Sequence, residues 1–500
     1  MYYIKIQGHP FENEIREMML QYFHGENIKI LKDYKSIYTN EDYVITSAMK
    51  EKSNYYIIYT LIEKDGQKIS KEELQVPIPL LCTKTIKDKL IKRKLKITLY
   101  YAMKIGFNRT LPWGILTGIR PTKIVHKLIN EGITDEKIIG ILKSNYLLTH
   151  KKAILLMDVT RYERDIIYPT NKNKIGLYIG IPFCPSRCIY CSFLSSVLGK
   201  NRDILKEYLE ALKVEIREIG EYINKNNINI ESIYIGGGTP TILNSNELKE
   251  LLSTIEKEID INQVKEYSLE AGRPDTINKD KLKIAIQHRV NRISINPQTM
   301  NENTLINIGR MHSPEDIIKS YKLAREVGFS IINMDLILGL PGENTDIVKE
   351  TLKQIEELQP ENLTIHTMSI KKGSELKAKL GNIKFDQEEN ITEMLEATQD
   401  FAVKNGYIPY YLYRQKYMMG NLENVGYCKK DYKSIYNIQM MSEKQTIIGL
   451  GAGSVTKVIF LDEDRIERMP NVKDIKQYIQ RIHELINRKL LLLNSLYKPN

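Results

Sequence analysis

The chain changes character near residue 174, where short apolar runs begin to alternate with longer segments of helical periodicity. The strand-like runs are GLYIGIPF, ESIYIGGG, EYSLEAG, NRISINP, SIINMDLILGL and ENLTIHTM, and segments such as DILKEYLEALKVEIREIGEYI and DKLKIAIQH separate them. Strand and helix in strict alternation predict βα units around a parallel sheet. Six such units are fewer than a closed eightfold barrel requires. The pattern therefore predicts an α/β fold, a partial (β/α)6 TIM-like barrel over residues 171–381.

The first 170 residues follow a different pattern, which predicts an N-terminal α+β accessory domain (1–170). MYYIKIQG alternates apolar and polar residues like a strand, and SNYYIIYTLIE resembles a longer one. Segments that begin at Lys84 and at Pro121 have helical spacing, and Pro121 suits the first turn of its helix. Between them, LPWGILTGIRPTK (111–123) holds the only Trp and is either a docking element or a tight connection.

Residues 382–500 predict a C-terminal α+β extension, which we expect to cover the substrate. An amphipathic helix, QEENITEMLEATQDFAVKNG, precedes the aromatic stretch YIPYYLYRQKYMMGNLENVGYC and the glycine turn IGLGAGS. Aromatic residues at that density form either plain core or the wall of a pocket for a flat apolar ligand with acidic arms. In the second case, Arg414 and Lys416 are the expected charge partners of the ligand.

Polar residues follow the predicted strands where a βα barrel carries its reactive groups, at the carboxyl ends. They are the cysteine loop after the first strand, Gly236, Gly237, Gly238 and Thr239 after the second, Glu270 at the end of the third, Gln298 after the fourth and Asp335 near the end of the fifth. We therefore expect these groups to converge on one mouth of the barrel. A triple glycine also lets a turn bring backbone N–H and C=O groups close to a ligand.

Three of the five cysteines, Cys184, Cys188 and Cys191, fall within eight residues as C-x-x-x-C-x-x-C, directly after the first apolar run. Three thiolates can hold three corners of an iron–sulfur cube and leave the fourth iron free to bind a small molecule. A hydrophobic core does not need three cysteines in one loop. A structural zinc site needs four closed ligands, and the nearest histidines in sequence are His150 and His288. The spacing therefore predicts a 4Fe-4S cluster.

Arg310 follows the fourth strand in NIGRMHSPED, where Ser313, Pro314 and Asp316 predict the start of a helix. Its guanidinium is suited to bidentate pairing with a carboxylate. A plain surface arginine is the alternative.

The 500 residues predict two or three domains of a globular cytoplasmic protein. The sequence has no uninterrupted apolar run of about 18 residues, so it predicts no membrane span. The start MYYIKIQGHPFENE does not have the pattern of a secretory signal. The odd and sparse cysteines suit a reducing cytoplasm rather than a disulfide framework. The isolated Cys82 and Cys428 are expected to be buried structural thiols.

The net charge of +11 favours acidic partners, whether polycarboxylate, phosphate or nucleic acid. Its densest source is KTIKDKLIKRKLK (84–96), in which apolar residues recur with near-helical spacing. We interpret this segment as a helix with a solvated basic face, rather than as a patch that binds nucleic acid or substrate. No aromatic residue interleaves with the lysines before Tyr100 and Tyr101.

Taken together, YIGIPFCPSRCIYC, GGGTPTIL, LEAGRPDTI, RISINPQTMNENTLINIGRMHS and DLILGLPGE resemble the radical S-adenosylmethionine (SAM) enzymes. Within them, the ordered set is similar to the oxygen-independent coproporphyrinogen III oxidase (dehydrogenase) family, in the branch with an amino-terminal extension. The cysteine motif alone indicates only a radical SAM enzyme. The resemblance extends over the barrel and the C-terminal region, and less securely over the first 170 residues.

The resemblance implies that Cys184, Cys188 and Cys191 ligate the 4Fe-4S cluster and that SAM chelates the open iron. The positions that match SAM contacts of the family are Tyr178, Tyr190, Gly237, Gly238, Thr239, Glu270, Gln298, Arg310 and Asp335. Of these, Tyr178 and Arg310 are the candidates for a catalytic role. A guanidinium suits the methionyl carboxylate, and carboxylate or amide groups suit the amino group and the ribose hydroxyls.

The activity that the resemblance implies is oxidative decarboxylation in porphyrin and haem biosynthesis. The reduced cluster cleaves SAM to methionine and a 5′-deoxyadenosyl radical, which abstracts hydrogen from a propionate of coproporphyrinogen III. Loss of carbon dioxide and one electron leaves a vinyl group. The implied partners are a low-potential electron donor of the flavodoxin or ferredoxin type and an electron acceptor, and we expect a monomer with no membrane partner and no nucleic acid.

Two departures limit the choice of substrate. The best-matched oxidases carry a fourth cysteine where this chain has Phe193, and a histidine where it has Gly180. The related haem chaperone branch also lacks that cysteine. Its C-terminal motif has a His followed by Asn and, three residues later, Tyr, and here ENVGY places Glu423 where the His would be. A carboxylate is a poor substitute for imidazole on haem iron.

A radical SAM enzyme that acts on nucleic acid such as RNA is the third alternative. The positive charge and the additional amino-terminal domain favour it. The basic run lacks the stacking aromatics that bind single-stranded nucleic acid, and we rank this alternative last.

Overall fold

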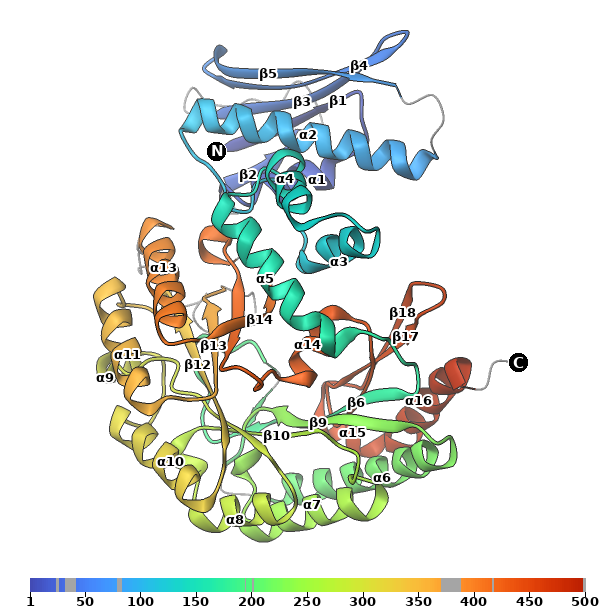
Figure 1. The fold of residues 1–500 in the computed structure, drawn as a ribbon, viewed down its shortest axis with the longest axis vertical. Helices are drawn as coiled ribbons and strands as arrows, with labels where there is room; N and C mark the ends of the chain where they lie inside the picture. Colours follow the sequence, from blue (N-terminus) through green and yellow to red (C-terminus); the bar gives the residue numbers. More distant parts are fainter. Residues whose placement is uncertain are drawn as a thin grey trace. The chain divides into compact units, whose positions relative to one another are not determined.

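The computed structural model describes residues 1–23, 27–31, 42–78, 83–193, 195–199, 202–369, 388–415 and 418–497. These residues form two compact units (Figure 1). The first unit consists of Met1–Asp158 with Arg414–Leu422, and the second of Val159–Tyr413 with Glu423–Asn500. The division lies within helix α5 (His150–Ile167), somewhat before the change of sequence pattern near residue 170. The separate domain predicted over 382–500 stays a prediction.

The first unit is a mixed five-stranded sheet with helices. Its elements are β1 (Tyr2–Gln7), α1 (Glu12–Met19), β2 (Ile28–Ile30), β3 (Tyr43–Glu51), β4 (Tyr55–Lys64), β5 (Gln67–Pro77), α2 (Lys84–Phe107), α3 (Thr122–Asn130) and α4 (Asp135–Asn145). The strand order is β2-β1-β3-β4-β5, with β1 parallel to both neighbours and the other pairs antiparallel. An α+β unit was predicted here, with strands at β1 and β4 and helices at α2 and α3.

Helix α2 packs against β4 and β5 and closes the core of the first unit. Strand β4 alternates buried and half-buried residues, so Tyr56, Ile58 and Ile62 enter this core. The predicted basic helix is α2, but its basic residues are less solvated than predicted. Lys92 pairs with Glu14, and other basic residues of the helix are half-buried.

The second unit holds the predicted barrel. Its elements are β6 (Lys174–Ile181), β7 (Phe183–Cys184), β8 (Ser196–Val197), α6 (Asp203–Lys225), β9 (Asn229–Gly237), α7 (Ser245–Glu258), β10 (Glu266–Gly272), α8 (Lys279–Gln287), β11 (Arg292–Ile295), α9 (Glu302–Asn307), α10 (Pro314–Val327), β12 (Ile331–Leu338), α11 (Thr345–Leu358), β13 (Asn362–Thr367), α13 (Glu388–Lys404), β14 (Ile408–Tyr413), β15 (Asn424–Cys428), α14 (Ile435–Ser442), β16 (Thr446–Leu450), β17 (Val455–Phe460), β18 (Arg465–Pro470), α15 (Ile475–Gln480) and α16 (Ile482–Tyr497).

Strands β6, β9, β10, β11, β12 and β13 pair in this order and all run parallel. Figure 1 shows α6, α7, α8 and α10 along the outer side of these strands. The six predicted βα units are therefore confirmed. Helix α10 also begins as predicted, with a capping box between Ser313 and Asp316 and Pro314 in its first turn.

Further strands extend both edges of the parallel sheet, and it does not close into a barrel. Strand β15 pairs antiparallel with β13, and β14 pairs antiparallel with β15. At the other edge, β16 pairs parallel with β6 and is followed by β17 and β18. Together they form an 11-stranded sheet over the part of the chain that the structure describes. The carboxyl ends of the parallel strands point to one side, where the cysteine loop lies.

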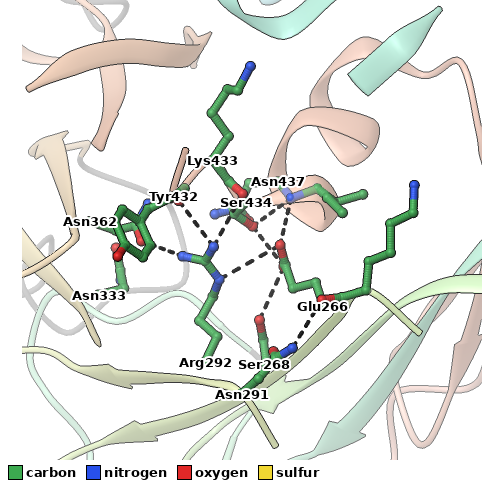
Figure 2. A network of polar contacts seen from close by, with 12 residues as sticks. Glu266, Ser268, Asn291, Arg292, Asn333, Asn362, Tyr432, Lys433, Ser434 and Asn437 are labelled. Carbon is green, nitrogen blue, oxygen red and sulfur yellow. Dashed lines mark hydrogen bonds and ion pairs between the residues drawn. The ribbon is translucent and has the colours of Figure 1, made fainter. Parts of the chain in front are cut away.

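A buried polar network ties the start of two barrel strands to the residues before α14 (Figure 2). The guanidinium of Arg292 lies 3.7 Å from the carboxylate of Glu266 and donates to the carbonyl oxygens of Tyr432 and Lys433. Glu266 accepts in turn from the hydroxyl of Ser434 (2.9 Å). These bonds fix α14, whose Tyr436 belongs to the site described below. No described helix is long and apolar enough to cross a membrane.

Candidate functional site

The cysteine loop begins directly at the carboxyl end of β6, as predicted. Cys184 ends the short strand β7, which pairs with β8 so that Cys184 lies opposite Val197. Cys184 and Cys188 are buried, and Cys191 is half-buried. All three are free thiols, and the Cys191 N–H donates to the Cys188 carbonyl (3.0 Å). The three candidate ligands therefore lie in one short, mostly buried loop.

The loop is fixed to segments that follow the third and fourth barrel strands. The Ile189 N–H donates to the carbonyl of Ile308 (3.2 Å). Arg273, after β10, donates from one nitrogen to Cys188 Sγ (3.0 Å) and from another to Ser186 Oγ (2.7 Å). These contacts hold the cysteines over the end of the parallel sheet.

The thiols differ in acidity because their surroundings differ. Burial opposes ionisation of Cys188, but the nearby cations Arg310 and Arg273 outweigh it and lower the pKa of this thiol. Burial raises the pKa of the Cys191 thiol, with a contribution from the other two cysteines. Cys188 is therefore the thiol that its surroundings favour as a thiolate.

Among the described residues, no group of three or more His, Cys, Asp and Glu side chains is arranged to hold a metal ion. Thiolates on three corners of an iron–sulfur cube lie further apart than the ligands of one ion. Three free thiols with short spacing, a neighbouring cation and no disulfide fit such a cluster.

The glycine turn after β9 lies against the cysteine segment. The N–H groups of Gly238 and Thr239 donate to the carbonyls of Ile181 and Phe183 (both 2.8 Å), and the Thr239 hydroxyl donates to Cys184 Sγ (3.5 Å). A Cβ on Gly238 would lie 2.4 Å from the Phe183 carbonyl oxygen, so only glycine fits there. These two N–H groups are therefore engaged within the protein.

Glu270 lies at the centre of the polar group inside the barrel. The Tyr234 hydroxyl donates to its carboxylate (2.5 Å). Burial raises the pKa of Glu270 to about 7, and the charge of Asp335 adds to this effect. A Cβ on Gly236 would lie 2.9 Å from the Glu270 carboxylate, so the glycine of the turn also makes room for this side chain.

Three tyrosine rings stack next to Glu270. Tyr178 on β6 lies opposite Tyr234 on β9, and their ring centroids are 6.3 Å apart. Tyr436 on α14 stacks on Tyr234 at 4.4 Å and on Tyr178 at 6.2 Å. Tyr178 was predicted from the resemblance, whereas Tyr234 and Tyr436 were not. Strand alternation gives the signal for Tyr234, which lies two residues before Gly236 and shares its face.

Asp335 forms the opposite side of this group with Gln298 and His366. The Gln298 N–H donates to the Asp335 carbonyl (2.8 Å), and Gln298 has a positive φ of 69°. His366 Nε2 on β13 lies 3.8 Å from the Asp335 carboxylate. Burial opposes ionisation of Asp335, but hydrogen bonding and charge from His366 outweigh it and lower its pKa. His366 is a polar residue of the site that the sequence analysis missed.

Arg310 is buried beside the cysteine loop, which excludes the alternative of a plain surface arginine. Its guanidinium donates to the carbonyl of Asn296 (2.5 Å) and to the Tyr190 hydroxyl (3.3 Å). Among the described residues, its Nε and the side-chain oxygen of Asn296 are buried without a hydrogen-bond partner. A ligand with both acceptor and donor groups, such as the amino acid end of SAM, fits these two atoms.

His312 is a second buried residue here that the sequence analysis did not single out. Neither of its ring nitrogens has a hydrogen-bond partner among the described residues. Burial and the charges of Arg310 and Arg273 lower its pKa to about 3. The ring is therefore neutral at ordinary pH.

The structure thus brings the predicted residues into two connected groups. Around the cysteine loop lie Cys184, Cys188, Cys191, Tyr190, Thr239 and Arg310, and inside the barrel lie Tyr178, Gly237, Glu270, Gln298 and Asp335, with Gly238 between the groups. Their roles toward the cluster and SAM stay predictions.

Tyr410 and Tyr411 of the C-terminal aromatic stretch and Trp113 of the tryptophan loop are buried core residues. Tyr410 and Tyr411 pack with Cys428 in a hydrophobic cluster. The Arg414 guanidinium lies over the ring of the buried Trp113 and donates to the carbonyl of Asn421 (2.7 Å) within the first unit. Arg414 as a charge partner of a ligand was therefore wrong, because protein groups already surround its charge. Lys416 and Cys82 lie outside the described residues.

Replacing Glu270 with glutamine is expected to stabilise the protein by about 3 kcal/mol at pH 8 and by less than about 1 kcal/mol at pH 5. The pKa of Glu270 is about 7 in the folded protein and near 4.5 in the unfolded chain. The folded state therefore binds the extra proton between these values, and the wild type loses stability as pH rises through them. Urea unfolding of both proteins at the two pH values measures the effect, and an equal difference at pH 5 and pH 8 would contradict it.

The chain is similar to known proteins over its barrel and over most of its length. The family model described as "Radical SAM superfamily" matches residues 178–355, from Tyr178 through most of α11. The chain is 36% identical over 460 residues to the "Oxygen-independent coproporphyrinogen-III oxidase-like protein HemZ" of Bacillus subtilis, a match that covers 91% of each chain. The similarity therefore includes the first unit as well as the barrel.

Two further relatives match shorter parts. The "Heme chaperone HemW" of Bacillus subtilis is 30% identical over 311 residues, which cover 61% of this chain and 76% of the relative. The structure described as coproporphyrinogen III oxidase (HemN) from Escherichia coli, a radical SAM enzyme, superposes with a TM-score of 0.51 at 24% identity, over 67% of this chain and 72% of that one. This likeness supports the fold alone.

Proposed function

Because the chain belongs to the radical SAM superfamily, in the oxygen-independent coproporphyrinogen III oxidase-like family, we propose that it oxidatively decarboxylates propionates of coproporphyrinogen III. The observation that best supports radical chemistry is the meeting of three free thiols with a buried arginine, a glycine turn and two carboxylates at one end of the parallel strands. The substrate is inferred from the relatives' names.

The three thiols, Arg273 and the glycine turn would hold a 4Fe-4S cluster with SAM on its open iron. When bound, the cluster and SAM together supply a 5′-deoxyadenosyl radical. Glu270 and Asp335 have acceptor oxygens for hydroxyl or ammonium groups, and Arg310 has a buried donor for a carboxylate. The rings of Tyr178, Tyr234 and Tyr436 stack beside these carboxylates and would offer a flat apolar surface to a bound ligand.

For each propionate, the reaction removes atoms and an electron that the radical and a partner must take up. One hydrogen atom leaves the carbon next to the ring, and carbon dioxide and one electron leave the rest, so that a vinyl group remains. The electron that cleaves SAM comes from a low-potential donor of the flavodoxin or ferredoxin type, and a separate acceptor takes the electron released by the substrate. Both carriers are part of this proposal.

The haem chaperone is the second candidate, because a relative of that name is 30% identical over part of the chain. The position where that branch is expected to carry its histidine holds Glu423, which is fully buried. Its carbonyl accepts from the Thr367 hydroxyl (3.0 Å) and its carboxylate from Gln399 (3.4 Å). A buried carboxylate with protein partners is a poor axial ligand for haem, which supports the enzyme over the chaperone.

One anaerobic experiment separates the candidates. The cluster is reconstituted, SAM and a reductant are added, and 5′-deoxyadenosine is followed with coproporphyrinogen III, haem or RNA present. Formation of vinyl porphyrinogen together with 5′-deoxyadenosine supports the proposal. Stoichiometric haem binding without porphyrinogen turnover supports the chaperone, and 5′-deoxyadenosine formed only with RNA supports the third alternative.

A further inference from the structure

Arg273 contacts the cysteine loop directly, and the proposed function gives it no part in substrate chemistry. Its side chain is only 4% exposed. One guanidinium nitrogen donates to Cys188 Sγ (3.0 Å) and a second to Ser186 Oγ (2.7 Å), so the planar fork spans two residues of the loop. Arg273 therefore fixes both the direction and the surroundings of one of the three ligand sulfurs.

The local backbone is built to turn this side chain toward the loop. The pairing of β10 with β11 shifts register between Glu270 and Gly272, and Gly272 has a positive φ of 58°. The Arg273 N–H then donates to the Ala271 carbonyl (2.5 Å), and Pro274 begins a short 3-10 turn, Pro274–Thr276. As a result, Glu270 meets Tyr234 inside the barrel while Arg273 reaches the cysteines.

No carboxylate neutralises Arg273 among the described residues. None of the ion pairs within the described ranges includes this guanidinium. A buried cation without a counter-ion is costly, whereas a buried cation paired with an anion is tolerated. Of the two side chains to which its guanidinium donates, only Cys188 becomes an anion, when its sulfur ligates iron.

We propose that Arg273 is a positioning residue that orients the Cys188 thiolate and raises the reduction potential of the cluster that this thiolate ligates. The inference rests on the cluster-binding part of the proposed function. On reduction, the cluster gains one electron from the donor, and the guanidinium keeps its proton. Because the reduced cluster carries one more negative charge, a fixed cation with a hydrogen bond to a ligand sulfur stabilises the reduced form more than the oxidised form.

The test compares Arg273→Gln with the wild type in the full-length holoprotein. Iron and sulfide content are measured first, and the reduced fraction of the cluster is then followed by EPR during an anaerobic redox titration. The ratio of reduced to oxidised cluster at a fixed ambient potential is expected to fall about tenfold, which for one electron corresponds to about 59 mV toward more negative values. Arg273→Lys, which keeps the charge but not the fork, is expected to fall between the two.

Arg325→Gln is the control, because Arg325 is a half-buried arginine that is bonded to Glu361 and is distant in sequence from the cysteine loop. Its ratio should equal that of the wild type. A ratio for Arg273→Gln within twofold of the wild type overturns the inference. If Arg273→Gln does not hold iron, Arg273→Lys decides in its place: a lower ratio supports the inference and an unchanged ratio overturns it.

Failure of this inference and failure of the proposed function give different results. A wild type that holds the cluster but leaves coproporphyrinogen III unchanged contradicts the proposed substrate, and the comparison of potentials still stands. Equal potentials in proteins that do form vinyl porphyrinogen contradict the role of Arg273 alone.

Discussion

Cys184→Ala is expected to lose the cluster and, with it, to reduce 5′-deoxyadenosine formation more than about hundredfold, a larger loss than removing a residue that only hydrogen-bonds to a ligand causes. Cys184 is one of three thiols in the loop and the only one held by a strand pair, between β7 and β8. Two remaining thiolates cannot hold a cube at three corners. Iron content after anaerobic reconstitution and the rate of SAM cleavage measure the effect.

Cys428→Ala is the matched control, because Cys428 is a fully buried cysteine on β15, outside the cysteine loop. It should keep the iron content and the SAM cleavage of the wild type and cost about 1 kcal/mol of stability through the lost packing. A full cluster in Cys184→Ala that still cleaves SAM would contradict the assignment of the loop as the cluster site.

Lys489→Met is expected to destabilise the protein by about 3–5 kcal/mol, because it leaves a buried carboxylate without its cation. Lys489 on α16 and Glu215 on α6 are fully buried, with Nζ 2.5 Å from the carboxylate oxygen. Burial opposes ionisation of Glu215, but Lys489 outweighs it and lowers its pKa. Urea unfolding monitored by circular dichroism measures the change.

Lys404→Met provides the comparison for this experiment, since Lys404 is an exposed lysine 3.4 Å from Glu356 and should contribute only about 0–1 kcal/mol. Adding Glu215→Gln to Lys489→Met removes the unpaired charge and should restore part of the stability. Equal unfolding free energies for Lys489→Met and Lys404→Met would show that the buried pair is not needed.

The same ion pair connects the C-terminal helix to β16, which pairs with β6, the strand that precedes the cysteines. Lys489 also donates to the Gly449 carbonyl (2.6 Å), and Glu215 accepts from the Gly451 N–H (2.7 Å). Gly451 lies so close to Gly180 that a Cβ there would be 2.6 Å from the Gly180 carbonyl oxygen. We therefore expect Lys489→Met to weaken cluster retention as well as global stability.

The sequence by itself determined the order of strands and helices in the barrel and the cluster loop. Strand and helix periods differ, and each predicted run is long enough to show its period, so β6, β9, β10, β11, β12 and β13 lie where the pattern placed them. The three cysteines are close in sequence, and their spacing carries chemical meaning without a fold. Helix α10 was likewise fixed by local capping residues.

Only the tertiary structure decided which distant side chains complete the site. Arg273, Tyr436 and His366 do not stand out in the sequence. A register shift brings Arg273 to Cys188, and the packing of α14 stacks Tyr436 on Tyr234. The neighbouring strand β13 brings His366 to Asp335. The same holds for Arg414, which the sequence offered to a ligand and the fold placed over Trp113. Local patterns specify secondary structure, but contacts between residues far apart in the chain depend on how the elements pack, which one sequence does not state.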